Sequence, residues 1–160
     1  GHGICFATGT ALAAKLDGRL YHTYVVMGDG ESQEGSVWEA AAFAANQGLS
    51  NMTVVMDCNG LQASAYIEDI SSIEPLKAKW ESFGWTVLEC SGHDFSELIQ
   101  SFERAKATER PTMILARTIK GKGVSLAENN PAWHSRAPKG EEWDKICEEY
   151  RIRKEELTRL

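Results

Sequence analysis

The stretch that decides the fold is VVMGDGESQEGSVWEA, residues 25–40. An apolar, β-branched run leads into Gly-Asp-Gly, and an alanine-rich segment with helical spacing follows. Glycines after a strand are typical of a phosphate-binding turn, because backbone N–H groups can approach an anion closely there. This turn also carries Asp29, Glu31 and Glu34, whose carboxylates repel phosphate. The sequence therefore raises the question of what could hold a phosphate beside these acids.

The apolar run belongs to a set of four that are rich in β-branched residues. They lie at residues 21–27, 51–57, 84–90 and 110–117. Each run is continuous rather than alternating, which is typical of strands covered on both faces. Helical patterns accompany them at residues 3–18, 35–48, 74–84 and 94–109. Strands that alternate with helices predict an α/β fold, a three-layer α/β/α domain with a mainly parallel sheet.

Two of the predicted helices carry recognisable ends. Gly48 is a plausible residue to end the helix over 35–48, and either Asp94 or Ser96 could cap the start of the helix over 94–109. In the first of these helices we expect one apolar stripe, made by Val37, Trp38, Ala41, Ala42 and Ala45.

The carboxyl-terminal quarter has a different character. Residues 118–140 show neither helical nor strand periodicity and are long for a loop in a compact domain, so we expect a functional loop there. The tail over 141–160 is charged and has a helical pattern. Its predicted apolar stripe consists of Trp143, Ile146, Cys147 and Tyr150.

Composition limits the class of protein. A length of 160 residues suits a single domain spanning 1–160, and the start at Gly1 inside a motif predicts that this domain is incomplete at its amino terminus. The net charge of −6 argues against nucleic acid as the main partner. The apolar runs are too short to span a membrane. The four cysteines lack C-x-x-C spacing and no secretory signal precedes them, so we expect reduced, mostly buried thiols in a cytoplasmic protein.

A divalent cation would explain the acids in the phosphate turn. Asp29 follows the first strand and Asn59 follows the second, and one helical crossover separates them. Ligands bind beyond the carboxyl ends of parallel strands, so the two side chains can converge. Carboxylate and amide oxygens suit Mg²⁺ or Ca²⁺, and such an ion bridges protein acids to phosphate oxygens. The sequence therefore predicts a metal–diphosphate site.

Other glycine-rich and acidic motifs do not fit the spacing. Gly28, Gly30 and Gly35 give G-x-G-x-x-x-x-G rather than the dinucleotide pattern G-x-G-x-x-G, and the Gly-Lys-Ser/Thr of a P-loop is missing from the sequence. In an EF-hand loop beginning at Asp29, Glu34 would occupy the position that requires glycine.

The segment GDGESQEGSVWEAAAFAANQGLSNMTVVMDCNGLQ resembles the thiamine-diphosphate signature, in which Asn follows Gly-Asp-Gly after about thirty residues. The form GDG-x-x-QEG-x-x-WEA with D-x-N is similar to the amino-terminal, pyrophosphate-binding domain of transketolases. It is most similar to the amino-terminal subunit of split transketolases. The resemblance extends through GWTVLECSGHD, RPTMILARTIKGKGVS and ENNPAWHSRAP.

The resemblance implies roles for individual residues. Asp29 and Asn59 would supply side-chain ligands to Mg²⁺, with Ca²⁺ or Mn²⁺ as substitutes, and Leu61 would supply its carbonyl oxygen. Glu34 would belong to a hydrogen-bond network across a subunit interface, and His134 would contact diphosphate and substrate, which makes these two the expected catalytic residues. The residues implied to bind the cofactor are Asp29, Gly30, Glu31, Asn59, Leu61 and His134.

The resemblance also implies an activity and a partner. Thiamine diphosphate provides the carbanion chemistry, and the family transfers a two-carbon ketol unit from a ketose donor to an aldose acceptor, often as sugar phosphates. The glutamate that activates the cofactor lies in a separate pyrimidine-binding domain, so we expect a carboxyl-terminal subunit or domain as partner, in a dimer or α2β2 assembly. Deoxyxylulose-phosphate synthesis, dihydroxyacetone synthesis and a non-catalytic scaffold remain alternatives; QEG with WEA disfavours a 2-oxoacid dehydrogenase component.

Overall fold

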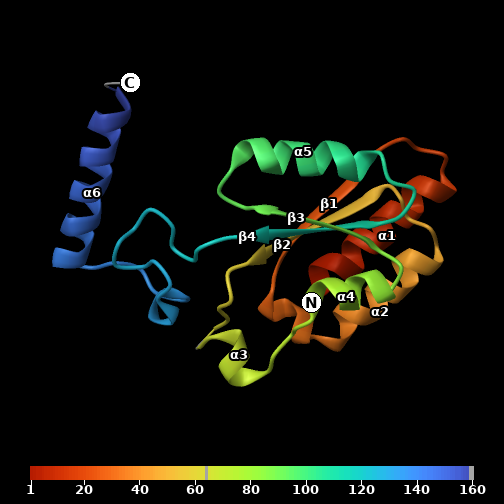
Figure 1. Cartoon of the computed structure of the whole chain (residues 1–160), viewed down its shortest axis with the longest axis horizontal. Coiled ribbons are helices and arrows are strands. Elements are labelled where there is room, and N and C mark those ends of the chain that lie inside the picture. Colours follow the sequence, from red (N-terminus) through yellow and green to blue (C-terminus); the bar gives the residue numbers. More distant parts are fainter. Residues whose placement is uncertain (64, 159–160) are drawn as a thin grey trace.

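A computed structural model describes residues 1–63 and 65–158 of the chain (Figure 1). Four strands form a parallel sheet in the order β1-β2-β4-β3. The strands are β1 (Thr23–Gly28), β2 (Met52–Cys58), β3 (Thr86–Ser91) and β4 (Thr112–Arg117). All four lie within two residues of the predicted runs, because a short apolar, β-branched segment flanked by turn residues has few alternatives to a buried strand.

Helices connect the strands and cover the sheet. They are α1 (His2–Leu16), α2 (Gly35–Asn46), α3 (Ile67–Ile70), α4 (Leu76–Ser82), α5 (Phe95–Lys106) and α6 (Glu141–Thr158). Two short 3₁₀ helices are η1 (Gly30–Gln33) and η2 (Pro131–Trp133). The four predicted helices correspond to α1, α2, α4 and α5.

The core lies on both faces of the sheet, as the three-layer prediction requires. On β4, Met113 and Leu115 join a cluster with α1, α2 and α4, whereas Ile114 and Ala116 face the opposite way, toward α5. This alternation follows from the two-residue period of a strand. The α/β/α fold class is confirmed.

The prediction that every strand is covered on both faces is wrong for β1. This edge strand alternates in burial, with Met27 buried and Val26 73% exposed. Tyr24 lies on the α5 face, where its ring packs edge-on against that of Phe102. Among the described elements, α5 is the long helix on that face. Its contacts with β3 and β4 show that it lies over those two strands.

Helix ends follow the predicted chemistry. Gly48 has a φ of +57°, and the N–H groups of Gly48 and Leu49 donate to the carbonyls of Ala45 and Ala44, which is a Schellman ending. Asp94 rather than Ser96 caps α5, because its carboxylate accepts from the N–H groups of Ser96 and Glu97.

The predicted stripe of α2 needs correction. Ala42 is exposed, and Ala40 and Ala44 are buried in its place. The buried face of α2 is therefore made by Val37, Ala40, Ala41 and Ala44, and the helix packs closely against α1.

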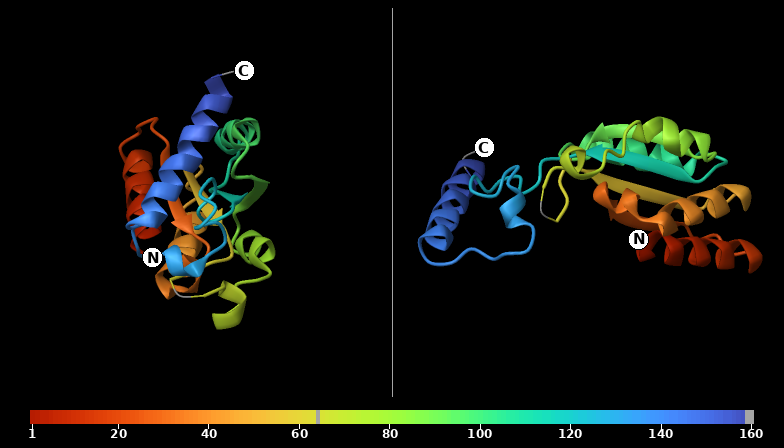
Figure 2. Two further views of the ribbon diagram at one scale, coloured as in Figure 1. Left: turned by 90° about the vertical axis from the view of Figure 1, so that its left-hand side faces the viewer. Right: turned by 90° about the horizontal axis from the view of Figure 1, so that it is seen from below.

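The segment 118–158, which we call the arm, projects away from the rest of the chain (Figures 1 and 2). Helix α6 begins at the predicted residue; residues 159 and 160 of the predicted tail lie outside the described part of the chain. Its predicted apolar stripe is wrong. Ile146 is buried, but Trp143, Cys147 and Tyr150 are exposed. Within the described residues, the side-chain contacts of α6 with other segments are made with the loop before it, as between Glu149 and Ser125.

The cysteine prediction is correct in part. All four thiols are free, yet only Cys58 and Cys90 are buried, whereas Cys5 and Cys147 are exposed. In the described residues, the helices are all too short or too polar to cross a membrane.

Candidate functional site

The candidate site lies at the carboxyl edge of the sheet, where β1 and β2 end side by side. The parallel register pairs Gly28 with Asp57, so the turns that follow the two strands are neighbours. The backbone N–H of Asp29 continues this pairing by donating to the carbonyl of Asp57 at 3.1 Å. Asp29 and Asn59 therefore follow adjacent strand ends, as their spacing predicts.

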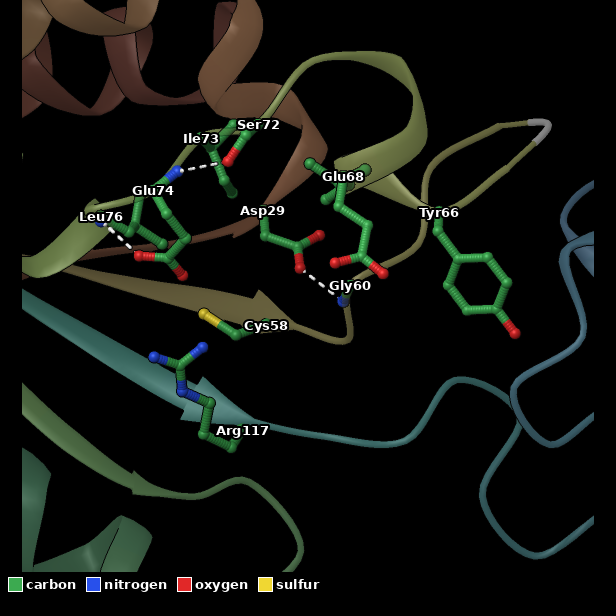
Figure 3. Close-up of a pocket in the computed structure, with 11 residues that line it drawn as sticks. Asp29, Cys58, Gly60, Tyr66, Glu68, Ser72, Ile73, Glu74, Leu76 and Arg117 are labelled. Carbon is green, nitrogen blue, oxygen red and sulfur yellow. Dashed lines mark hydrogen bonds between the residues drawn. The ribbon is translucent and has the colours of Figure 1, made fainter.

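Asp29 joins the two turns. Its side chain is buried, with 4% exposed, and its two oxygens accept hydrogen bonds from different turns. Oδ1 accepts from the N–H of Gly30 at 2.9 Å, and Oδ2 accepts from the N–H of Gly60 at 2.7 Å. Figure 3 shows the second of these bonds. Burial raises the pKa of the Asp29 carboxyl, the two backbone donors oppose this rise, and the nearby Asp57 adds to it. The ionised carboxylate is thus costly here in the absence of positive charge.

Asn59 is fixed by two hydrogen bonds. Its Oδ1 accepts from the N–H of Leu61 at 2.9 Å, and its Nδ2 donates to Oδ2 of Asp57 at 3.1 Å. Leu61 is buried and pairs with Tyr66 across a short antiparallel bridge. Residues 59–61, at the start of the loop after β2, are therefore held close to Asp29.

Gly30 and Glu31 complete the first turn. A Cβ atom on Gly30 would lie 2.9 Å from Cβ of Gln62, so this position has no room for a side chain. Oε2 of Glu31 accepts from the N–H of Gly28 at 3.3 Å. Beside this turn, Nε2 of Gln62 is buried and has no acceptor among the described residues.

A cavity of about 250 Å³ opens next to Asp29. It contains groups that the sequence did not reveal as site residues: Cys58, Glu68, Glu74 and Arg117 (Figure 3). Burial raises the pKa of the Cys58 thiol to about 12, although the charge of Arg117 opposes the rise. Arg117 could have been found from its place at the end of β4, the strand next to β2.

Two of the residues predicted to belong to the site, Glu34 and His134, do not line this cavity. Glu34 is exposed in the link between η1 and α2, where its backbone is extended. His134 is exposed on the arm, with Nδ1 3.3 Å from Nζ of Lys120, and it does not line the cavity. The arm contacts the segment after β2 through a hydrogen bond: the hydroxyl of Tyr66, in that segment, donates to the carbonyl of Asn129, on the arm, at 3.3 Å.

Comparison with protein families gives a match to the family described as "Transketolase, thiamine diphosphate binding domain" over residues 1–157. Among curated proteins, an apulose-4-phosphate transketolase subunit of Actinobacillus succinogenes is 42% identical over 93% of this chain and 54% of its own length. The 6-deoxy-6-sulfo-D-fructose transketolase subunit of a Clostridium species is 41% identical over 89% of this chain and 52% of its own. The chain spans about half the length of these relatives.

Solved structures agree with the sequence matches. The transketolase of Campylobacter jejuni superimposes with a TM-score of 0.79 at 30% identity, over 82% of this chain and 22% of that chain. A transketolase of Pichia stipitis gives a TM-score of 0.75 at 25% identity, over 97% of this chain and 28% of that chain. The chain therefore belongs to the transketolase family and represents its amino-terminal, thiamine-diphosphate-binding domain.

Proposed function

We propose that this chain supplies the metal–diphosphate half of a transketolase active site, in an enzyme that transfers a two-carbon ketol unit from a ketose to an aldose. The observation that carries the proposal is the junction of two strand-end turns at Asp29, whose carboxylate accepts hydrogen bonds from Gly30 and Gly60. Asp29, Asn59 and the carbonyl of Leu61 would hold Mg²⁺, and Gly30 and Glu31 would lie along the diphosphate.

The donor set fits a hard cation with an anionic ligand. A carboxylate, an amide oxygen and a backbone carbonyl are oxygen donors of the kind that Mg²⁺ prefers. A cation would also offset the cost of keeping the buried Asp29 carboxylate ionised. The unpaired Nε2 of Gln62, the side chain that packs against Gly30, is a donor that a phosphate oxygen could satisfy.

When bound, thiamine diphosphate supplies the electron sink for breaking and forming a carbon–carbon bond, and the protein positions it. In this chain, the turns after β1 and β2 would fix the diphosphate end. His134 and Lys120 lie 3.3 Å apart on the arm, and two neighbouring nitrogen-bearing side chains of this kind suit an anionic group of cofactor or substrate. Glu34 would act at a subunit interface, which its exposed position at the start of α2 permits.

The partner would be a carboxyl-terminal, pyrimidine-binding subunit or domain. Two relatives that match nearly all of this chain are named as single subunits of a transketolase, and these names support an assembly of unlike subunits. For the donor, we propose a ketose that carries phosphate or sulfonate, since the names of the similar subunits include a phosphorylated and a sulfonated sugar.

The test is reconstitution of the full-length protein with its pyrimidine-domain partner, thiamine diphosphate and Mg²⁺. We expect ketol transfer that stops when a chelator removes the metal and returns when Mg²⁺ is restored. Asp29→Ala should weaken metal-dependent cofactor binding by more than about 100-fold, since loss of groups that merely orient ligands already costs about 10–100-fold.

Asp17→Ala is the matched control, because Asp17 is an exposed aspartate at the end of α1. It should leave binding unchanged. Absence of metal-dependent cofactor binding in the assembled complex would overturn the proposal in favour of a scaffold. Binding without ketol transfer to any phosphorylated or sulfonated sugar would point to another thiamine-dependent reaction.

A further inference from the structure

Asp57 is a half-buried carboxylate at the end of β2, two residues before Asn59. No role is assigned to Asp57 in the site proposed above, yet its two carboxylate oxygens accept hydrogen bonds from residues that follow two different strands. Oδ1 accepts from the hydroxyl of Thr118, which directly follows β4, and Oδ2 accepts from Nδ2 of Asn59 at 3.1 Å. Its backbone carbonyl accepts from the N–H of Asp29 after β1.

This arrangement determines which end of the Asn59 amide faces away from Asp57. An amide has a donating NH₂ and an accepting oxygen, and only the oxygen can bind a cation. An ionised carboxylate accepts hydrogen bonds and donates none, so Asp57 pairs with the NH₂ end. The N–H of Leu61 selects the same orientation from the other side, because it donates to Oδ1.

Thr118 in turn fixes Asp57. The backbone N–H of Thr118 donates to the carbonyl of Cys58 at 3.2 Å, which ties the end of β4 to the end of β2. With its backbone held in this way, the Thr118 hydroxyl meets Oδ1 of Asp57 and limits the rotation of that carboxylate. Hydrogen bonds therefore run from β4 through Asp57 to the amide of Asn59.

We propose that Asp57, held by Thr118, is a positioning residue that orients the Asn59 amide so that its oxygen faces the metal. The inference rests on the proposed function, because it assigns the reason for which Asn59 can act as a ligand. Groups that orient metal ligands typically contribute about 10–100-fold to metal affinity.

The experiment measures Mn²⁺ affinity by titration of the free-ion paramagnetic resonance signal, with the full-length protein, its partner and thiamine diphosphate present. Asp57→Ala should weaken Mn²⁺ binding by about 10–100-fold. Asp57→Asn should restore most of that loss, because one oxygen can still accept from Asn59 while its NH₂ faces the Thr118 hydroxyl. Thr118→Val should have an intermediate effect, since it frees the carboxylate to rotate.

Thr53→Val is the matched control. It removes a threonine hydroxyl from the opposite end of β2, where Thr53 bonds to His22 at 2.8 Å, and it should leave Mn²⁺ affinity unchanged. Thermal denaturation without metal checks that each variant is folded. If Asp57→Ala does not fold, a weaker affinity in Thr118→Val than in Thr53→Val supports the inference, and equal affinities overturn it.

A double-mutant cycle separates positioning from a general effect of charge or structure. If Asp57 acts through Asn59, Asp57→Ala should cause no further loss in an Asn59→Ala background. An equal loss in both backgrounds would overturn the inference while leaving the metal site in place. Failure of the unaltered protein to bind Mn²⁺ with the cofactor would instead overturn the proposed function, and the inference with it.

Discussion

The body of the molecule (residues 1–117) and the arm (residues 118–158) are stabilised in different ways. In the body, apolar side chains from α1, α2, α4 and three strands form one buried cluster. In the described part of the arm, Ala127 and Ile146 are the buried apolar residues. The arm is instead linked by exposed polar contacts, such as those of Ser125 with Glu149 and of Arg136 with Glu142.

This difference indicates that most of the stabilising free energy of folding comes from the body. Burial of a large side chain contributes about 1.5–3 kcal/mol, whereas an exposed ion pair contributes about 0–1 kcal/mol. The arm should therefore open at a much lower free-energy cost than the body. His134 lies on the arm, and Asp29 and Asn59 lie on the body, so the proposed site combines residues from a stable and a less stable region.

The largest expected effect on stability comes from comparing a tryptophan of the body, Trp80, with a tryptophan of the arm, Trp143. Trp80 is fully buried against Trp38 and Trp85, so Trp80→Ala should lower the free energy of unfolding by about 3–5 kcal/mol. Trp143 in the arm is 56% exposed, and Trp143→Ala should change stability by less than about 0.5 kcal/mol. Urea denaturation measures both. Similar losses for the two variants would mean that the arm is packed as tightly as the body.

A second test compares thiols. Cys58 in the body is buried with its pKa raised to about 12, so little reactive thiolate is present near pH 8. Cys147 on α6 is exposed. In the native protein, a thiol reagent should modify Cys147 roughly a thousandfold faster than Cys58, since the thiolate is the reacting form.

Mass spectrometry of digested protein assigns the labels in this experiment. The unfolded protein in denaturant is the control, and there the two thiols should react at similar rates. Rapid labelling of Cys58 in the native protein would contradict the description of the body as closed around this side chain.

The smallest effect concerns pH. Burial, with a lesser contribution from Lys106, lowers the pKa of His22 below its ordinary value of 6.5. The folded state therefore favours neutral His22, and the free energy of unfolding should fall as the pH drops below 6.5. In the arm, Arg136 and Arg151 lower the pKa of Glu142 and Glu148, so stability there is lost only below their ordinary value of 4.5.

The two regions are thus expected to respond in separate pH ranges. Denaturation of the unaltered protein and of His22→Gln between about pH 7.5 and 5 tests this, since Gln does not titrate. The variant should lose the decline in that range. A decline of equal size in both proteins would assign it to other groups.

Much of the body could be predicted from the sequence. The strand positions, the ending of α2 at Gly48 and a cap of α5 at Asp94 or Ser96 all follow from local chemistry, and the structure selects Asp94. The neighbouring positions of Asp29 and Asn59 could also be predicted, because parallel strands joined by one crossover end at the same edge of a sheet. The same reasoning could not predict the hydrogen bond to Asp57 from the hydroxyl of Thr118, which lies 61 residues further along the chain.

The arm shows where the prediction failed. Trp143, Cys147 and Tyr150 have helical spacing and lie on a helix, yet no described segment covers them. Periodicity indicates which residues share a face, but it carries no information about what packs against that face. For the same reason, Val26 was expected to be buried and is mostly exposed.

By itself, the sequence determined the order of the four strands and their intervening helices along the chain, and the turns that bear the proposed ligands, because these depend on contacts within a few residues. It also determined that the strands are parallel, because a helix between two strands acts as a right-handed crossover. Only the tertiary structure decided which faces are covered, how far the arm stands from the body and how Thr118, Asp57 and Asn59 join. Those features depend on which distant segments meet, and the free energy of such contacts is not encoded in any local pattern.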